Sequence, residues 1–328
     1  MAAPMAPPAV ADDEIVYESM PRLRVYRNRV ERYPGADDFV AASADVNVAV
    51  ASRDTTISAR VSVRVYLPRA RLDATKIPVL VYYHGGGFCL CSAFDSTYHA
   101  YLRRFAALAD VLVVSVEYRL APEHPVPSAY ADSWEALAWV VSHRAGGDED
   151  EPWLADHADF SRLYLGGDSA GANIAHHMAM RAGVEKGLAL RGLVLIHPYF
   201  LGSDGVASDG LDRAARERLG WLWRVACPDT KGEDDPLINP LADGAPGIQA
   251  LACGRVLVCV AEDDVLRDRG KAYYDRLLGT GGWRGEAEIS QARGKGHRFH
   301  LFDPCCSEAI AQDKAIGAFL NPEGRSQV

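Results

Sequence analysis

The sequence predicts an α/β protein with a mainly parallel central sheet and helices on both faces. Continuous apolar runs of strand length recur at 77–83, 111–116 and 255–261, as expected of strands covered on both faces. Segments with helical patterning alternate with these runs, which is typical of a parallel sheet built from strand–helix–strand units. The 328 residues are 48% hydrophobic and 24% charged, which suits a large globular protein of this class.

The chain before residue 77 is expected to differ from the rest. The first part of residues 1–22 is Ala/Pro-rich and then acidic. This composition predicts a short disordered leader. Apolar alternation favours a short hairpin at 23–32 and strands at 46–50 and 59–68. The last of these alternates strictly, as a half-buried antiparallel strand does.

From residue 77 onward, strands and helices are expected to alternate without internal repeats. The run 128–143, for example, places Trp134, Leu137 and Val141 on one helical face. The polar, turn-rich stretch 227–246 interrupts this alternation of strands and helices and could belong to a cap over an active site. Further strands are predicted at 163–167, 190–196 and 286–290. Further helices are predicted at 98–109, directly after residue 169, and at 212–226, 268–278 and 307–320. Loops are predicted at 146–152 and 294–302.

Ser169 lies where a predicted strand bends into a predicted helix. The pattern Gly167-x-Ser169-x-Gly171 is that of a nucleophile elbow, in which a strained turn lifts a serine hydroxyl out of the sheet. The N–H groups at the start of the following helix favour a developing negative charge nearby. Short matches of this kind also occur in turns without chemistry, so the partner residues decide.

Acyl transfer by a serine also needs a base and an acid that orients the base. The order Ser169, then an acid, then His297 matches the order of nucleophile, acid and histidine in α/β-hydrolases. Position after a buried strand favours Asp263 or Asp264 as the acid, and His300 competes with His297. Glu262 and Asp268 are further rivals for the acid.

The run His84-Gly85-Gly86-Gly87 follows another buried strand and is typical of an oxyanion hole. Glycines let backbone N–H groups converge on one point without obstruction by side chains. We expect Gly86, Gly87 and Ala170 to donate, with Gly85 either donating or serving the turn. A phosphate-binding loop is disfavoured because neither the GxGxxG spacing nor a Lys-Ser/Thr ending is present.

The remaining patterns bear on ligands. Phe88, Leu90, Trp221 and Trp223 could form an apolar substrate pocket, although aromatic residues at helical spacing more often belong to a core. No CxxC pair or HExxH pattern predicts a metal site, and no cofactor is expected.

Charge and targeting signals limit the partners. A net charge of -9 argues against nucleic acid and anionic membranes, and no apolar run approaches the length of a membrane span. The N-terminal residues lack the features of a secretory signal or a transit peptide, so the expectation is a cytoplasmic protein. The oligomeric state stays open.

Five segments together point to a family: HGGGF, YRLAPEHPVPSAY, GGDSAGANIAHHMAMR, EDDVLRDR and GKGHRFHLF. The chain resembles plant carboxylesterases of the hormone-sensitive-lipase-like branch of the α/β-hydrolases, from about residue 23 to residue 320. The resemblance implies one α/β-hydrolase domain over 23–320 that includes cap segments, an N-terminal cap that starts within 1–22, and a tail at 321–328. It also selects Asp264, with Ser169 and His297, as the triad.

The resemblance implies a serine carboxylesterase that cleaves small carboxylic esters through an acyl-enzyme intermediate. Three relatives leave other functions open. The gibberellin receptor is similar but replaces the catalytic histidine, whereas His297 is present here. Some 2-hydroxyisoflavanone dehydratases carry Thr at the position of Ser169, and tuliposide-converting enzymes use the same triad for internal acyl transfer. A receptor, a dehydratase and an acyl-transferring enzyme are therefore the alternatives.

Overall fold

The computed structural model divides the chain into two compact units, residues 1–38 and 39–328. Most of the expected leader, 1–13, and most of the tail, 323–328, lie outside the described residues. The structure describes residues 14–19, 22–26, 29–33, 38–45, 48–69, 76–145, 151–185, 188–279 and 282–322.

The first unit contains a three-stranded antiparallel sheet with the strand order β1-β2-β3. Its strands are β1 (Ile15–Ser19), β2 (Leu23–Tyr26) and β3 (Val30–Arg32). The hairpin predicted at 23–32 corresponds to β2 and β3. Strand β1 lies in the part of 1–22 that follows the expected leader; it was not predicted, because this short strand is held by hydrogen bonds to β2 and carries little pattern of its own.

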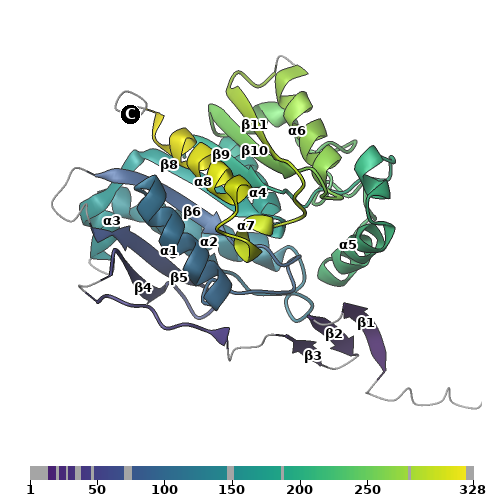
Figure 1. Ribbon diagram of the computed structural model, residues 1–328, viewed down its shortest axis with the longest axis horizontal. Coiled ribbons are helices and arrows are strands. Elements are labelled where there is room, and N and C mark those ends of the chain that lie inside the picture. Colours follow the sequence, from purple (N-terminus) through teal and green to yellow (C-terminus); the bar gives the residue numbers. More distant parts are fainter. Residues whose placement is uncertain are drawn as a thin grey trace, which may run out of the picture. The chain divides into compact units, whose positions relative to one another are not determined.

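The second unit is built on an eight-stranded sheet with the order β11-β10-β9-β8-β6-β7-β5-β4 (Figure 1). Strands β6 to β11 run parallel, while β5 pairs antiparallel with both β7 and β4. The predicted fold class is therefore confirmed. The strands are β4 (Val50–Thr56), β5 (Ser62–Pro68), β6 (Ile77–Tyr83), β7 (Leu112–Glu117), β8 (Ala158–Asp168), β9 (Gly192–Ile196), β10 (Arg255–Ala261) and β11 (Glu286–Ala292).

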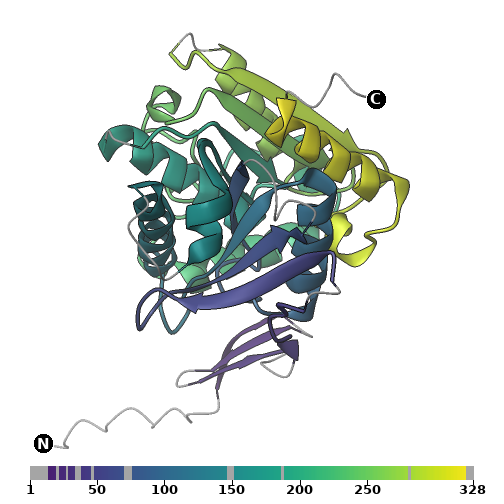
Figure 2. The same ribbon diagram turned by 90° about the vertical axis from the view of Figure 1, so that its left-hand side faces the viewer.

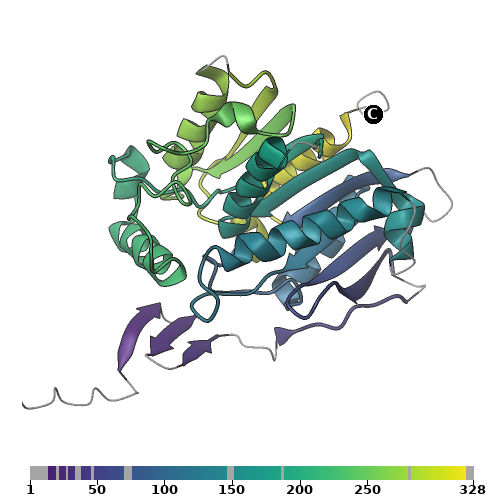
Figure 3. The ribbon, with the colours of Figure 1, turned by 180° about the vertical axis from the view of Figure 1, so that it is seen from behind.

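Helices cover both faces of this sheet. Helices α1 and α8 pack against each other on one face, and α2 and α4 lie on the other (Figures 1 and 3). Figure 2 shows these two helical layers on opposite sides of the sheet. The helices are α1 (Ser96–Ala109), α2 (Ser128–Ser142), α3 (Pro152–His157), α4 (Ala170–Glu185), α5 (Arg213–Ala226), α6 (Arg267–Gly279), α7 (Phe299–Phe302) and α8 (Ser307–Leu320), with 3-10 turns at His143–Ala145, Ala207–Gly210 and Ile248–Ala250.

A hydrophobic core joins the sheet to α1 and α8. Each large apolar side chain buried there stabilises the fold by about 1.5–3 kcal/mol. The sheet contributes alternate residues of neighbouring strands, as a strand period of two requires. Members of this core are Leu80, Tyr82, Tyr164, Val194, Leu257, Leu102, Phe105, Ile316 and Phe319.

The order of the strands reverses beside β6, which has β7 on one side and β8 on the other. Ligand sites of parallel sheets lie at the carboxyl ends of the strands next to such a switch point. Strand β6 ends just before the glycine run, β8 ends just before Ser169, and β10 ends three residues before Asp264. The topology therefore brings three segments that are distant in sequence to one edge of the sheet.

None of the helices in the described part of the chain has the length and apolar character that a membrane crossing requires.

Candidate active site

Ser169 occupies a sharp turn between β8 and α4. Its backbone is left-handed, with a φ of 54°, a conformation that costs a non-glycine residue free energy and is retained where the surroundings enforce it. The Ser169 N–H donates to the Ile196 carbonyl at 2.9 Å. A Cβ at Gly171 would lie 1.8 Å from the Tyr83 carbonyl oxygen, so only glycine fits where the elbow meets β6.

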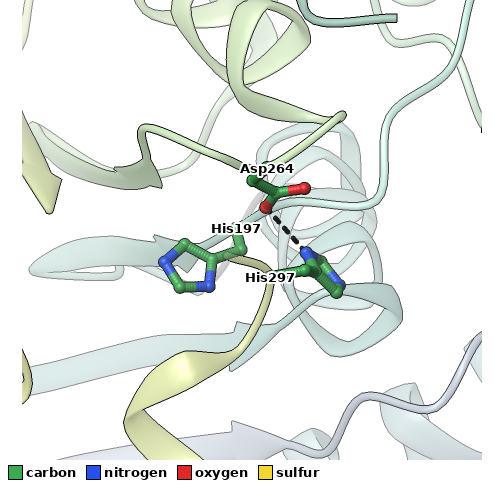
Figure 4. A group of neighbouring side chains, drawn as sticks. All are labelled: His197, Asp264 and His297. Atoms are coloured by element: carbon green, nitrogen blue, oxygen red, sulfur yellow. Dashed lines mark hydrogen bonds and ion pairs between the residues drawn. The ribbon is translucent and has the colours of Figure 1, made fainter. Parts of the chain in front are cut away.

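His297 joins Ser169 to Asp264. Its Nε2 lies 2.9 Å from the Ser169 Oγ, and its Nδ1 lies 2.7 Å from the Asp264 Oδ2. Figure 4 shows the imidazole of His297 directed at the Asp264 carboxylate. An ionised carboxylate can only accept, so Nδ1 carries the proton and Nε2 is left to accept from the serine hydroxyl.

Asp264 is held as a buried carboxylate, with 1% of its surface exposed. Burial by itself raises the pKa of Asp264, but the neighbouring His297 and the hydrogen bond between them keep that pKa below its ordinary value. The Leu266 N–H donates to the other carboxylate oxygen at 2.9 Å. The Asp264 carboxyl is therefore ionised and accepts the hydrogen bond that orients His297.

The rival acids and the rival histidine have other surroundings. Glu262 accepts the Gly294 N–H, Asp268 accepts from Ser208 and Arg267, and Asp263 is exposed. His300 is fully buried in a T-shaped contact with Tyr101, and burial lowers its pKa well below the ordinary value. Of the candidates weighed from the sequence, the structure brings Asp264 and His297 to Ser169.

The glycine run forms a tight turn beside the elbow. Gly86 has a φ of 112° and Gly87 a φ of 61°, and a Cβ at Gly86 would lie 2.1 Å from the Leu90 carbonyl oxygen. The Gly86 carbonyl accepts the N–H groups of Cys89 and Leu90. Within the described residues, no acceptor takes the N–H of Gly86 or Gly87. Ala170 begins α4, where N–H groups lack partners inside the helix.

Gly85 does not fit the oxyanion role that the sequence left open for it. Its N–H already donates to the Tyr98 hydroxyl at 2.7 Å and to the Asp168 carboxylate at 3.1 Å. A Cβ at Gly85 would lie 2.5 Å from an Asp168 carboxylate oxygen. Gly85 therefore anchors the loop, and the prediction that its N–H donates to the oxyanion is corrected.

The α/β-hydrolase fold family matches this chain over residues 80–301, which contain all of the residues just described. The chain belongs to the α/β-hydrolase family.

The chain is similar to plant members of the hormone-sensitive-lipase-like branch, as the sequence motifs predicted. Tuliposide A-converting enzyme 1 of Tulipa gesneriana is 47% identical over 96% of this chain and 80% of its own length. The 2-hydroxyisoflavanone dehydratase of Glycyrrhiza echinata is 45% identical over 94% of this chain and 96% of its own. Probable carboxylesterase 2 of Arabidopsis thaliana is 41% identical over 94% and 97%, respectively.

Solved structures agree with this family. The esterase LipW from Mycobacterium marinum has a TM-score of 0.69 at 30% identity, over 83% of this chain and 81% of its own. The hyperthermophilic esterase from Pyrobaculum calidifontis has a TM-score of 0.67 at 32% identity, over 83% of this chain and 86% of its own.

The pocket residues expected in this hydrolase are distributed differently. Phe88 and Trp223 are both 0% exposed and pack together with ring centroids 5.9 Å apart, so they belong to the core and offer a substrate no surface. Trp221 is 55% exposed on α5, and Leu90 is half-buried. Leu222, between the two tryptophans, instead lies against Gly87, where an added Cβ would meet its Cδ2 at 2.1 Å.

Sequence reasoning missed His197, which follows β9 and supports the histidine loop. The Arg298 N–H donates to the His197 Nδ1 at 2.9 Å. Burial lowers the pKa of His197 to about 4, so the ring is neutral and Nδ1 can accept. Its only sequence signal is its place after a buried strand.

His197, Asp264 and His297 are close enough to be considered as metal ligands (Figure 4). However, the Nδ1 atoms of His197 and His297 are engaged with the Arg298 N–H and with Asp264. This donor set does not fit a resident metal ion, because binding would require both of these contacts to be given up.

Proposed function

We propose that this hydrolase is a serine carboxylesterase that cleaves small carboxylic esters through an acyl-enzyme intermediate. The observation that carries the proposal is the position of His297, which lies within hydrogen-bond distance of both Ser169 and Asp264. Such an arrangement provides a nucleophile, a base and an orienting acid in one line. The esterases among the relatives and solved structures support the same class of substrate.

The reaction follows from these contacts. His297 Nε2 takes the proton of the Ser169 hydroxyl as Oγ attacks the ester carbonyl carbon. The N–H groups of Gly86, Gly87 and Ala170 stabilise the negative charge on the carbonyl oxygen. When the tetrahedral intermediate collapses, the proton on Nε2 goes to the leaving alcohol. Water then attacks the acyl-enzyme with His297 as base, and the bond to Ser169 Oγ breaks as Oγ takes the proton back from Nε2 and the acid leaves. Asp264 stabilises the imidazolium in both halves.

Replacing the nucleophile tests this assignment. We expect Ser169→Ala to lower turnover of a short p-nitrophenyl ester by roughly 10⁴-fold or more, because no other group can form the acyl-enzyme. The measurement is kcat on purified protein, with a fluorophosphonate probe and peptide mass spectrometry to locate the covalent adduct.

Ser115→Ala is the matched control. Ser115 is fully buried on β7, and its hydroxyl has no hydrogen-bond partner among the described residues. Its removal should leave turnover and labelling unchanged. An active Ser169→Ala protein, or an adduct at another residue, would refute the triad.

The relatives favour two alternatives that use the same scaffold, acyl transfer within one molecule and dehydration. The products distinguish them. Hydrolysis in H₂¹⁸O places ¹⁸O in the released acid, internal acyl transfer releases a product without ¹⁸O, and dehydration removes water from a hydroxylated flavonoid with no ester present. A receptor would bind a ligand without turnover and without a fluorophosphonate adduct.

We also propose that the protein is located in the cytoplasm, although the tuliposide-converting relatives are named chloroplastic or amyloplastic. Fractionation of plant cells that express the full chain checks it. Recovery with plastid stroma instead of cytosol would contradict the cytoplasmic assignment.

A further inference from the structure

A buried ion pair connects the residue before Ser169 with the residue after His297. Asp168 ends β8, and Arg298 begins the turn into α7. The Asp168 side chain is 0% exposed and the Arg298 side chain is 9% exposed. The Arg298 Nε lies 2.7 Å from the Asp168 Oδ2. Charges buried this deeply are retained when each has a partner, so the two groups depend on each other.

The same carboxylate also holds the glycine run. Asp168 Oδ1 accepts from the Tyr82 hydroxyl at 2.8 Å, from the Tyr98 hydroxyl at 3.0 Å and from the Gly85 N–H at 3.1 Å. Since Gly85 immediately precedes the proposed donors Gly86 and Gly87, a shift of the Asp168 carboxylate moves the oxyanion loop.

Arg298 fixes the loop that carries His297 from two directions. Its backbone is left-handed, with a φ of 58°, and its N–H is held by His197. Its guanidinium donates to the Tyr98 hydroxyl at 2.7 Å and faces Asp168. The direction of the His297 ring therefore depends on both ends of Arg298.

We propose that Arg298 and Asp168 are positioning residues that lock the nucleophile, the histidine and the oxyanion loop to one another. This inference rests on the proposed esterase function. Arg298 does not touch the reacting atoms; it acts through Asp168 and His297. Without the Arg298 charge, the Asp168 carboxylate would remain unpaired one residue from Ser169, where it would oppose the negative charge that develops on the substrate.

The test compares three variants with the wild type. We expect Arg298→Gln to lower kcat by about 10- to 100-fold with KM within twofold, because displacement of a reacting group by 1 Å can cost 10²-fold. The rate of fluorophosphonate labelling at Ser169 should fall in parallel. Arg298→Lys, which keeps the charge, should retain more kcat. The double variant Asp168→Asn/Arg298→Gln, which leaves no unpaired charge, should recover part of the loss.

Arg104→Gln is the control, because it breaks another ion pair with a buried carboxylate, in which Arg104 Nη2 lies 2.7 Å from Asp313 Oδ2 and the Arg104 side chain is 33% exposed. It should lower the thermal unfolding temperature and leave kcat unchanged. An unchanged kcat in Arg298→Gln, an equal loss in Arg104→Gln, or a double variant with no higher kcat than Arg298→Gln would overturn the inference.

A variant that does not fold and a wild type without esterase activity lead to different conclusions. If Arg298→Gln does not fold, wild-type kcat in both Arg298→Lys and the double variant overturns the inference, and a lowered kcat at unchanged KM supports it. A wild type that hydrolyses no ester would refute the proposed function instead, and the labelling rates would still decide whether Arg298 positions Ser169.

Discussion

At the scale of single residues, the proposed chemistry depends on which nitrogen of His297 carries the proton. Asp264 sets this, because its ionised carboxylate can only accept a hydrogen bond and lies 2.7 Å from Nδ1. The pKa of Asp264 is held below its ordinary value by His297 in spite of burial, which by itself raises it. Nε2 is thus left to take the proton from Ser169.

Asp264→Asn should therefore lower kcat by on the order of 10⁴-fold. The amide of asparagine can donate to Nδ1, which favours the tautomer with its proton on Nε2 and removes the base. The measurement is kcat for a short p-nitrophenyl ester between pH 6 and pH 9, with the loss expected across the whole range.

Asp263→Asn provides the comparison, since Asp263 is the exposed neighbour in the sequence. It should keep kcat within twofold of the wild type. A similar loss in both variants would mean that a general effect of charge, and not the Asp264–His297 contact, supports catalysis.

The sequence identified the residues that carry recognisable chemistry at strand ends. Ser169 had the elbow motif, and His297 had the expected order along the chain. Asp168 and Arg298 could not be found in this way, because no sequence motif pairs the residue before the nucleophile with the residue after the histidine. The role of Gly85 stayed open between donor and turn, because a glycine motif does not reveal which N–H groups other parts of the fold already use.

At the scale of elements, the elbow depends on how closely α4 approaches the end of β6. An added Cβ at Gly171 would lie 1.8 Å from the Tyr83 carbonyl oxygen and 2.7 Å from the His84 carbonyl oxygen. Both are backbone atoms beside the oxyanion loop and cannot rotate away. The second glycine of the motif is thus a requirement of packing between a helix and a strand.

Gly171→Ala should destabilise the protein by about 3 kcal/mol or more, because overpacking against rigid backbone costs at least the upper end of the usual range. Urea unfolding measures this. Gly205→Ala should stay within about 0.5 kcal/mol of the wild type, because an added Cβ there meets nothing within 4 Å. Equal stability of the two variants would contradict the close approach.

The long helices were predictable and the shortest helices were not. The helices predicted at 128–143 and 307–320 match α2 and α8 to within one residue, because strong apolar patterns span their whole length. Helix α3 has six residues and α7 has four, which is too short for a helical pattern to repeat. α7 lies within the region 294–302 that was expected to be a loop.

At the scale of the whole molecule, burial of ionisable groups links folding to pH. Among the described residues, six histidines have pKa values below the ordinary value, chiefly through burial, and stay neutral in the folded state: His84, His99, His176, His177, His197 and His300. Two carboxyls act in the opposite direction, because burial raises the pKa of Glu117 to about 7 and that of Asp313 to about 6.

The sign of the effect follows from proton binding. Between pH 6.5 and pH 4, each of these histidines takes up a proton on unfolding, since its folded pKa lies below its unfolded one. The two carboxyls release a proton on unfolding at pH values above about 4.5. Six uptakes against two releases leave a net uptake of about four protons near pH 5, so the histidines decide the direction.

We therefore expect the free energy of unfolding to fall steeply as the pH drops from 6.5 towards 4, by about 1.4 kcal/mol per pH unit for each net proton. Urea unfolding midpoints at pH 8, 7, 6 and 5 measure this. His177→Gln should make the decline shallower by about one proton, since the Gln amide can replace the donor that lies 2.9 Å from the Leu237 carbonyl oxygen and cannot titrate. Midpoints that stay constant from pH 7 to pH 5 would contradict this prediction. The histidines would then be protonated inside the fold, with water or a carboxylate in contact with their rings.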